Sequence, residues 1–356
     1  MKRLLPFLIL LFIFPTPAHA ATQTIQLTTA PNRNFSGQFI NKIFEKSLDK
    51  TGTLGALIFN PVARPRIWIM DAALIEDVQA LANENSTIAK DWLIRLKTIL
   101  GKDRIYATAY GDPDTRYLSA LAPAELNFYY VIGQQRLSTI LGQNIDTAKS
   151  LRNRTSKNKV PDYVRTFFKG TEDQFSLLAT VVGQPELEAD RVKIAELFNI
   201  TINETQRDEI LSDFQNGMDG VNAKLRIVNG RYRLTNSNEK VPITLVNEFR
   251  VPVKINLLFT PLNSRVQFPQ YKQITLGPSS KTQISVPIKS ITSGETSVIA
   301  RFENSKNQTV GTAGILDINS TTISSAVSWF TTGAGILLIL AAVAQSVRRV
   351  RNSRKS

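Results

Sequence analysis

The sequence predicts an α/β region, either an incomplete barrel or an open sheet with a helix-rich second part, followed by an immunoglobulin-like β-sandwich and one transmembrane helix. Three observations support this order. Short β-branched runs alternate with amphipathic patterns up to about residue 218, as is typical of α/β layers. After Asn222 the hydrophobic period changes from about 3.6 residues to about 2. Residues 325–344 carry no charge, which is typical of a membrane span.

The N-terminus predicts a signal peptide over residues 1–20. Lys2 and Arg3 precede the apolar run Leu4–Phe14, and Ala18-His19-Ala20 provides a small-x-small cleavage site. A retained membrane anchor is the alternative interpretation, but the run is shorter than the roughly 20 residues that a spanning helix needs. We therefore expect the residues that follow to be exported.

Residues 21–221 are predicted to form the extracytoplasmic α/β and helical region. We expect buried strands at Leu54–Phe59, Arg66–Met70 and Arg104–Tyr110. Asp71 and Ser86 stand where N-caps of two amphipathic helices are expected, and Gly101 stands where the second helix ends. Only three clear strands are predicted, whereas a complete barrel needs eight.

The second part of this region is predicted to be mostly helical. The expected helices are Leu126–Leu141 ending at Gly142, Phe175–Val182 capped by Thr171, and one capped by Asn203 that carries Ile210, Leu211 and Phe214. Between the first two, residues 149–159 hold five basic residues and no acid. A solvated loop is the expected structure, and a loop that contacts an anion is the alternative.

Residues 222–321 are predicted to form the β-sandwich, because short alternating runs are separated by Gly, Pro, Asn and Ser at regular intervals. The absence of cysteine leaves no Cys-Trp-Cys core of the true immunoglobulin type. The expected strands are Lys224–Val228, Tyr232–Leu234, Val241–Val246, Val251–Phe259, Gln273–Leu276, Thr282–Ile288, Thr296–Phe302 and Thr309–Ile318.

Residues 325–347 are the predicted transmembrane helix, and residues 348–356 are a basic cytoplasmic tail. The tail is rich in Arg and Lys, and short flanks of this composition stay in the cytoplasm. We therefore expect a single-pass type I protein of the cytoplasmic membrane, with the bulk of the chain extracytoplasmic. Trp329 and Phe330 suit the outer headgroup level.

The formal net charge of +14 includes two basic residues of the signal peptide and five of the tail, so the exported part keeps +7. A moderate positive charge suits a polyanionic envelope, although a solvated basic surface is the alternative. An exported region is not expected to bind nucleic acid. The sequence does not predict the oligomeric state.

The chemistry of a mature chain is restricted by its composition. There is no cysteine, and the single histidine, His19, belongs to the predicted signal peptide. Thiolate or imidazole metal sites, a Ser-His-Asp relay and a cysteine nucleophile are therefore excluded after cleavage. Phosphate-binding loops, Gly-x-Ser-x-Gly elbows and His-Glu-x-x-His motifs are also absent from the sequence. We predict no metal and no cofactor.

Five segments together resemble an uncharacterised family of actinobacterial single-pass envelope proteins. The segments are Trp68–Leu74, Trp92–Leu96, Ala109–Asp114, Val241–Asn247 and Val251–Val253. Members of that family share an α/β region, a β-sandwich and a C-terminal membrane helix, and their genes often lie beside the lipid II flippase gene. The resemblance implies an envelope setting linked to peptidoglycan or its precursors. It implies no established activity.

Three carboxylates are the candidate site residues. Asp71, Asp112 and Asp114 each follow the carboxyl end of a predicted strand, which is where α/β sheets assemble their sites. Two carboxylates there would suit acid and base catalysis on a glycan. Helix capping is the alternative, because Asp71 and Asp112 stand at N-cap positions and Asp114 in a first turn. Non-catalytic ligand binding is a third interpretation.

Three functions from different classes are compatible with these observations. The first is a non-enzymatic envelope protein that binds a protein or glycan partner at the outer face of the cytoplasmic membrane. The second is an accessory subunit of the lipid II transport or wall-assembly machinery that acts through the membrane helix and the tail. The third is a carboxylate-dependent glycan hydrolase.

Overall fold

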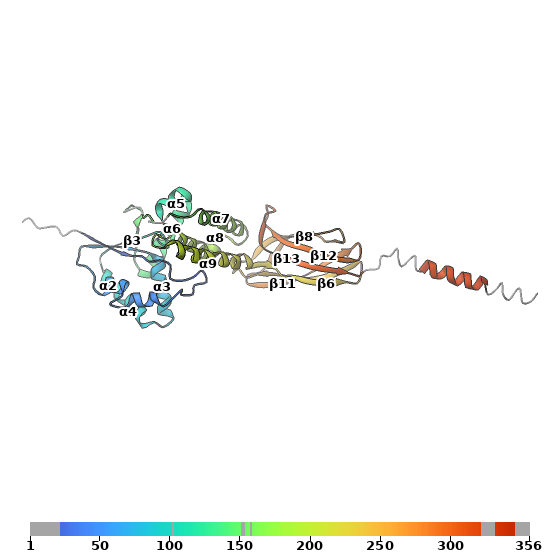
Figure 1. The fold of residues 1–356 in the computed structure, drawn as a ribbon, viewed down its shortest axis with the longest axis horizontal. Coiled ribbons are helices and arrows are strands. Elements are labelled where there is room, and N and C mark those ends of the chain that lie inside the picture. The colour runs from blue at the N-terminus through green and yellow to red at the C-terminus, as the bar shows by residue number, and fades with distance from the viewer. Residues whose placement is uncertain (1–21, 102, 151–153, 157–158, 322–331, 346–356) are drawn as a thin grey trace, which may run out of the picture. The chain divides into compact units, whose positions relative to one another are not determined.

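The computed structural model describes residues 22–101, 103–150, 154–156, 159–321 and 332–345 (Figure 1). These residues form two compact units. Unit 1 contains the described residues up to Asn158 together with Phe198–Asn203, and unit 2 contains Lys159–Leu197 and the described residues from Glu204 onward.

A parallel sheet of four strands forms the centre of unit 1, in the order β1-β2-β3-β4. In register, Leu27 stands beside Met70, and Met70 stands beside Ala107, so three strands end at the same edge. The open-sheet form of the α/β prediction is therefore confirmed. The strands are β1 (Gln23–Leu27), β2 (Arg66–Met70), β3 (Arg104–Ala107) and β4 (Asp146–Thr147).

Helices connect these strands and bury the core of unit 1. Trp68 of β2 and Trp92 of α4 are completely buried, and the Trp92 indole donates a hydrogen bond to the Leu54 carbonyl at 3.3 Å. The helices are α1 (Ile43–Leu48), α2 (Thr53–Phe59), α3 (Ala72–Asn83), α4 (Thr87–Leu100), α5 (Thr115–Leu121) and α6 (Pro123–Leu141), followed by the 3-10 turn η1 (Ala148–Ser150).

The predicted strand at Leu54–Phe59 is wrong, because this segment is helix α2. Leu54 and Ile58 are its buried apolar residues, and a spacing of four residues places them on one helical face. A short apolar run does not distinguish a strand from a buried helix. Gly55 lets α2 approach the preceding turn, since a Cβ there would lie 1.7 Å from the Asp49 carbonyl oxygen.

The predicted helix boundaries in unit 1 are confirmed at three places. The side chains of Asp71 and Ser86 accept hydrogen bonds from the first turns of α3 and α4. Helix α6 ends at Gly142, which has the left-handed conformation (φ 69°, ψ 28°) that glycine adopts without steric cost.

Three long or medium helices begin unit 2. They are α7 (Asp162–Val182), α8 (Gln184–Lys193) and α9 (Glu204–Ala223), with the 3-10 turn η2 (Ile194–Phe198) after α8. The prediction that Thr171 caps a helix is wrong, because Thr171 lies buried inside α7. One continuous buried stripe, which includes Phe168, Thr171 and Phe175, passes through the expected boundary at a spacing of three and four residues.

The β-sandwich of unit 2 confirms the predicted change of period. One sheet contains β10, β8, β12, β13 and β6, the other contains β7, β11 and β9, and β5 pairs with a strand of each. The strands are β5 (Leu225–Ile227), β6 (Gly230–Leu234), β7 (Asn238–Asn247), β8 (Val253–Pro261), β9 (Val266–Gln267), β10 (Tyr271–Leu276), β11 (Ser280–Ser290), β12 (Gly294–Glu303) and β13 (Thr309–Ser320).

The division between the units does not follow the predicted boundary between residues 221 and 222. Helices α7, α8 and α9 belong with the sandwich, since α7 and α9 contact β13. Asn304 donates a hydrogen bond to Thr180 at 3.0 Å, and Lys224 forms an ion pair with Asp190 at 3.0 Å. These contacts join the helical segment to the sandwich, and the hydrophobic periodicity of the sequence does not predict that association.

Within the described ranges, no helix is both long enough and apolar enough to cross a membrane. Residues 332–345 are helical. The remainder of the predicted transmembrane helix 325–347 lies outside the described residues, as do the predicted signal peptide 1–20 and the basic tail 348–356.

Candidate functional site

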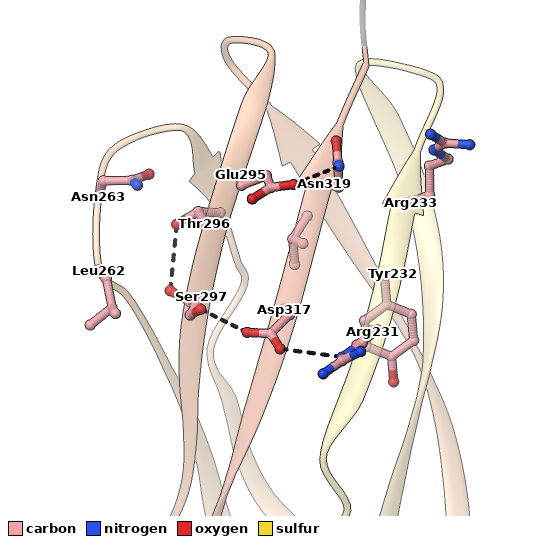
Figure 2. Close-up of a pocket in the computed structure, with 11 residues that line it drawn as sticks. Arg231, Tyr232, Arg233, Leu262, Asn263, Glu295, Thr296, Ser297, Asp317 and Asn319 are labelled. Carbon is pink, nitrogen blue, oxygen red and sulfur yellow. Dashed lines mark hydrogen bonds and ion pairs between the residues drawn. The ribbon is translucent and has the colours of Figure 1, made fainter.

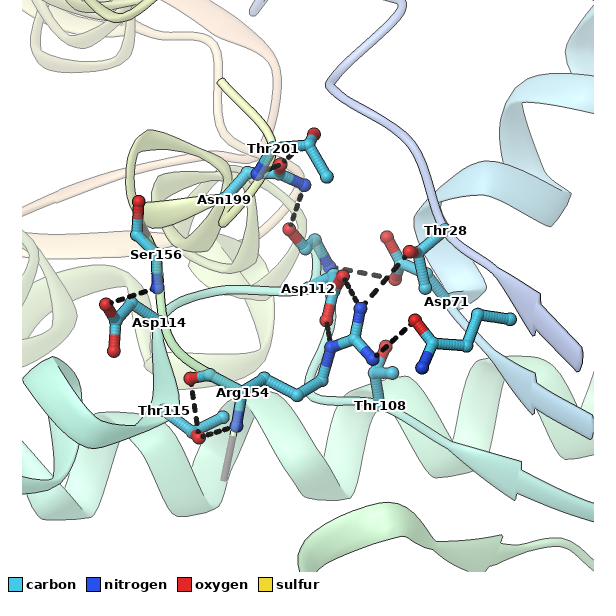
Figure 3. A network of polar contacts seen from close by, with 12 residues as sticks. Thr28, Asp71, Thr108, Asp112, Asp114, Thr115, Arg154, Ser156, Asn199 and Thr201 are labelled. Atoms are coloured by element: carbon cyan, nitrogen blue, oxygen red, sulfur yellow. Dashed lines mark hydrogen bonds and ion pairs between the residues drawn. The ribbon is translucent and has the colours of Figure 1, made fainter. Parts of the chain in front are cut away.

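The three candidate carboxylates gather at the carboxyl edge of the parallel sheet in unit 1 (Figure 3). Asp71 follows β2, whereas Asp112 and Asp114 lie in the turn between β3 and α5. Their exposed fractions are 2%, 0% and 6%. The structure therefore brings together the residues that the sequence singled out, in a buried position.

Asp71 caps helix α3 and also ties the neighbouring turn to it. Its Oδ1 accepts hydrogen bonds from the backbone N–H groups of Ala73 at 3.1 Å and Gly111 at 2.9 Å. Burial raises the pKa of Asp71 well above its usual value, and the negative charge of Asp112 acts in the same direction. Asp71 thus joins the end of β2 to the turn after β3.

The prediction that Asp112 caps a helix is wrong, because Asp114 occupies that position at the start of α5. Asp112 has a positive φ of 45° and forms an ion pair with Arg154. The Arg154 Nη2 group donates to its Oδ2 at 2.6 Å, and Arg154 Nε faces Oδ1. Burial raises the pKa of Asp112, whereas the Arg154 charge opposes that rise.

Arg154 joins this turn to the first strand. Its Nη2 group donates to Thr28 Oγ1 at 3.3 Å (Figure 3). Its Nη1 group donates to Gln26 Oε1, also at 3.3 Å, at the carboxyl end of β1. Its side chain is only 11% exposed. The solvated loop expected for residues 149–159 is therefore wrong at Arg154, which contacts a carboxylate; residues 151–153 and 157–158 lie outside the described residues.

Asp114 and Asn199 complete the network. Asp114 accepts hydrogen bonds from the backbone N–H groups of Tyr117 and Ser156, both at 2.8 Å. The Asn199 amide donates to the carbonyls of Thr29 and Gly111, both at 2.8 Å. Sequence reasoning missed Asn199, because its partners lie far away in the chain. Arg154 was included only as a member of the basic run 149–159.

The chemistry of this network is that of a buried polar tether. Each carboxylate accepts backbone hydrogen bonds or faces a guanidinium, which compensates the cost of its burial. A glycosidase acid and base must instead contact a substrate from two sides. Among the described residues, no three His, Cys, Asp or Glu side chains are placed to hold a metal ion. The arrangement favours the capping interpretation for Asp71 and Asp114, and a tethering role for Asp112.

A second candidate lies in unit 2, where an open hollow of ≈ 710 Å³ forms over β6, β13 and β12 (Figure 2). Figure 2 shows Asp317 between Ser297, which donates to it at 2.7 Å, and Arg231, whose Nε lies 3.8 Å away. The Asn319 amide donates to Glu295 at 3.0 Å. These side chains occupy alternate positions of paired strands and therefore share the outer face, because successive residues of a strand point to opposite faces.

The lining of this hollow combines polar and apolar groups. Arg233 and Asn263 are exposed, and Leu262 adds apolar surface. The Tyr232 side chain instead turns toward the other sheet, where its hydroxyl donates to the Pro242 carbonyl of β7 at 2.6 Å. Its volume is within the range of about 300–1,000 Å³ that small-molecule sites occupy. Exposed amide, carboxylate and guanidinium groups suit a ligand rich in hydroxyl and amide groups. Sequence reasoning did not single out these residues, because each appears there as an ordinary outward-facing strand position.

The profile of a family of unknown function, DUF6049, matches residues 130–352. None of the curated proteins that were compared matches the chain.

Several solved structures show a weak similarity. A Caenorhabditis elegans member of the MSP family, WR4, has 6% identity and a TM-score of 0.22 over 28% of this chain and 99% of its own. The CARDB domain of a Pyrococcus furiosus protein has 13% identity and a TM-score of 0.21 over 27% and 91%. A PapD-like domain of human CEP192 has 10% identity and a TM-score of 0.22 over 28% and 86%.

Proposed function

Because the chain belongs to DUF6049, a family of unknown function, we propose a function from its own sequence and sites. In this proposal the chain is a non-enzymatic, single-pass cell-envelope protein that binds a glycan or protein partner at the outer face of the cytoplasmic membrane. The signal-peptide pattern and the apolar segment before the basic tail support the location.

The hollow over β6, β13 and β12 is the observation that carries the binding role. It is lined by the guanidinium of Arg233 and the amides of Asn263 and Asn319. The three buried carboxylates of unit 1, by contrast, are engaged by backbone groups and by Arg154. A binding function therefore has a better-formed candidate surface than a hydrolytic one.

We propose a peptidoglycan fragment as the partner, which keeps the link to wall assembly that the sequence resemblance implies. Such a fragment carries sugar hydroxyls, acetamido groups and peptide carboxylates. Exposed Arg and Asn side chains bind groups of these kinds through charge-assisted and neutral hydrogen bonds.

The test is calorimetric titration of the full-length protein in detergent with soluble muropeptides. Arg233→Ala removes a charged donor from the hollow, and a lost hydrogen bond to a charged group costs about 1.5–3 kcal/mol. We therefore expect affinity to fall at least about tenfold. Lys289→Ala is the matched control, because Lys289 is exposed on β11 in the other sheet and does not line the hollow.

Two results would contradict the proposal. One is the absence of muropeptide binding by the wild-type protein, and the other is an equal effect of the Arg233 and Lys289 substitutions. Cleavage of the fragments by the wild-type protein, lost in Asp112→Asn with the fold intact, would assign hydrolysis instead.

A further inference from the structure

Three arginines and one aspartate meet at the opposite, amino-terminal edge of the parallel sheet in unit 1. Arg66 begins β2 and Arg104 begins β3, while Asp103 directly precedes β3 and Arg64 lies two residues before Arg66. All four residues line an open hollow of ≈ 690 Å³. This edge lies away from the carboxylate network and plays no part in the function proposed above.

Both oxygens of the Asp103 carboxylate are engaged by neighbouring side-chain donors. Its Oδ1 pairs with Arg64 Nε at 2.7 Å. Its Oδ2 accepts from Arg66 Nε at 2.5 Å and from the Trp68 indole at 3.0 Å. Burial opposes ionisation, but the hydrogen bonds from Trp68 and Arg66 and the arginine charges hold the pKa of Asp103 below its usual value. Asp103 therefore stays negative at neutral pH.

Each nitrogen of the Arg66 guanidinium already donates to a group of the protein, so Arg66 contributes positive charge to the hollow but no free nitrogen. Its Nη1 donates to the Val62 carbonyl at 2.9 Å, and its Nη2 donates to the Ile99 carbonyl at 2.7 Å. Its side chain is only 7% exposed and lies over the Trp68 ring. This guanidinium is thus a fixed, buried positive charge behind the hollow.

Arg64 and Arg104 supply the accessible donors. The Arg64 side chain is 56% exposed and is held by Asp103 and by a 3.3 Å hydrogen bond from its Nη2 to the Ile99 carbonyl. Its Nη1 has no hydrogen-bond partner among the described residues. Arg104 is exposed, and no carboxylate among the described residues lies within ion-pair distance of it.

The charges do not balance within this cluster. Three arginines and one aspartate line the hollow, so their formal charges sum to +2. Asp146 lines an adjoining hollow of ≈ 400 Å³ that also includes Arg104, but it forms no ion pair with that guanidinium among the described residues. Guanidinium forks match the geometry of oxyanions, and partly buried charges are screened by salt less than exposed ones are.

We propose that this arginine hollow binds a phosphate group, with Arg64 and Arg104 as the contacting residues and Arg66 as the buried charge behind them. A phosphate near neutral pH carries up to two negative charges, which matches the net charge of the hollow. The group belongs either to a soluble phosphate compound or to a phospholipid headgroup.

Calorimetric titration and thermal unfolding of the full-length protein in detergent test this proposal, with inorganic phosphate and short-chain dihexanoyl phosphatidylglycerol as probes. We expect phosphate to raise the unfolding temperature more than chloride does at equal ionic strength. Arg104→Ala should abolish that difference and weaken binding at least about tenfold, the loss typical of a hydrogen bond to a charged group. Because Arg104 has no ion-pair partner among the described residues, this variant is expected to fold.

Arg104→Lys and Lys97→Ala serve as controls. Lysine retains the charge but loses the fork, so an intermediate affinity is expected. Lys97 is exposed on α4 and does not line the hollow, so its removal should leave phosphate binding unchanged. Tighter binding of the lipid probe would assign a headgroup, and tighter binding of inorganic phosphate a soluble compound. Equal effects of phosphate and chloride, or unchanged phosphate binding in Arg104→Ala, would overturn the inference.

Discussion

Replacement of Asp112 by asparagine should destabilise unit 1 far more than the same replacement of Asp114. Asp112 is 0% exposed and faces the Arg154 guanidinium, whereas Asp114 caps α5 through a backbone hydrogen bond. Asparagine tolerates a positive φ and caps a helix about as well as aspartate does. The substitution therefore removes the charge opposite Arg154 at position 112, whereas at position 114 it keeps the cap and loses only the acceptor of the Ser156 N–H.

The expected magnitude follows from the burial of Arg154. Its side chain is 11% exposed, so loss of the opposing carboxylate leaves a largely buried charge without its counterion. Removal of one partner of a buried ion pair costs about 3–5 kcal/mol. Asparagine still offers one oxygen to Arg154, so we expect a loss of about 3 kcal/mol. Asp114→Asn retains the cap but loses the oxygen that accepts from the Ser156 N–H, so we expect it to cost about 1 kcal/mol.

The assay is denaturant-induced unfolding of the full-length protein followed by tryptophan fluorescence in a Trp329→Phe background. Trp68 and Trp92 are then the only tryptophans in the sequence, and both are buried in unit 1. A double-mutant cycle with Arg154→Met measures the pair itself. We expect the two substitutions together to cost at least about 1 kcal/mol less than their sum, since contacting residues couple.

Two results would refute this reasoning. The first is a loss in Asp112→Asn no larger than in Asp114→Asn. The second is a cycle that is additive within about 0.5 kcal/mol, which is the behaviour of residues that do not interact.

Three further predictions concern pH, backbone strain and topology. Burial and the charge of Asp112 raise the pKa of Asp71, so the protonated form of this group favours the folded state. The free energy of unfolding should therefore fall as the pH rises from the unfolded pKa of about 3.9 through the raised folded pKa. Asp71→Asn should flatten that slope in unfolding curves recorded across pH. Gly311→Ala should cost at least about 2 kcal/mol in thermal unfolding, because φ is 68° and a Cβ would lie 2.2 Å from the Leu225 carbonyl oxygen. The control Gly277→Ala meets only ordinary van der Waals contacts and should cost under about 1 kcal/mol. Equal losses in the two variants would contradict this prediction. Protease added to intact cells stripped of overlying wall should digest the chain up to about residue 322 and spare a tag fused after Ser356, and loss of that tag would contradict the type I orientation.

The amino-acid sequence predicts the elements that local chemistry decides. The positions of Asp71 and Ser86 before amphipathic runs identify the starts of α3 and α4, since their side chains satisfy nearby N–H groups. The alternating pattern after Asn222 identifies the strands of the sandwich, since successive side chains of a strand face opposite sides. The gathering of Asp71, Asp112 and Asp114 also follows from the parallel order of the strands that precede them.

Only the tertiary structure decides what is buried against what. Helix α2 was predicted as a strand, because its few apolar residues fit either period and packing against α4 selects the helix. Arg154 reaches Asp112 across 42 positions of the chain, and Asn199 reaches Gly111 across 88. No local propensity reports such partners, because the free energy of a buried ion pair or amide depends on groups that the chain brings together only on folding. The same reason explains why α7 and α9 join the sandwich, and why Asp112 is a tether where its sequence position predicted a cap.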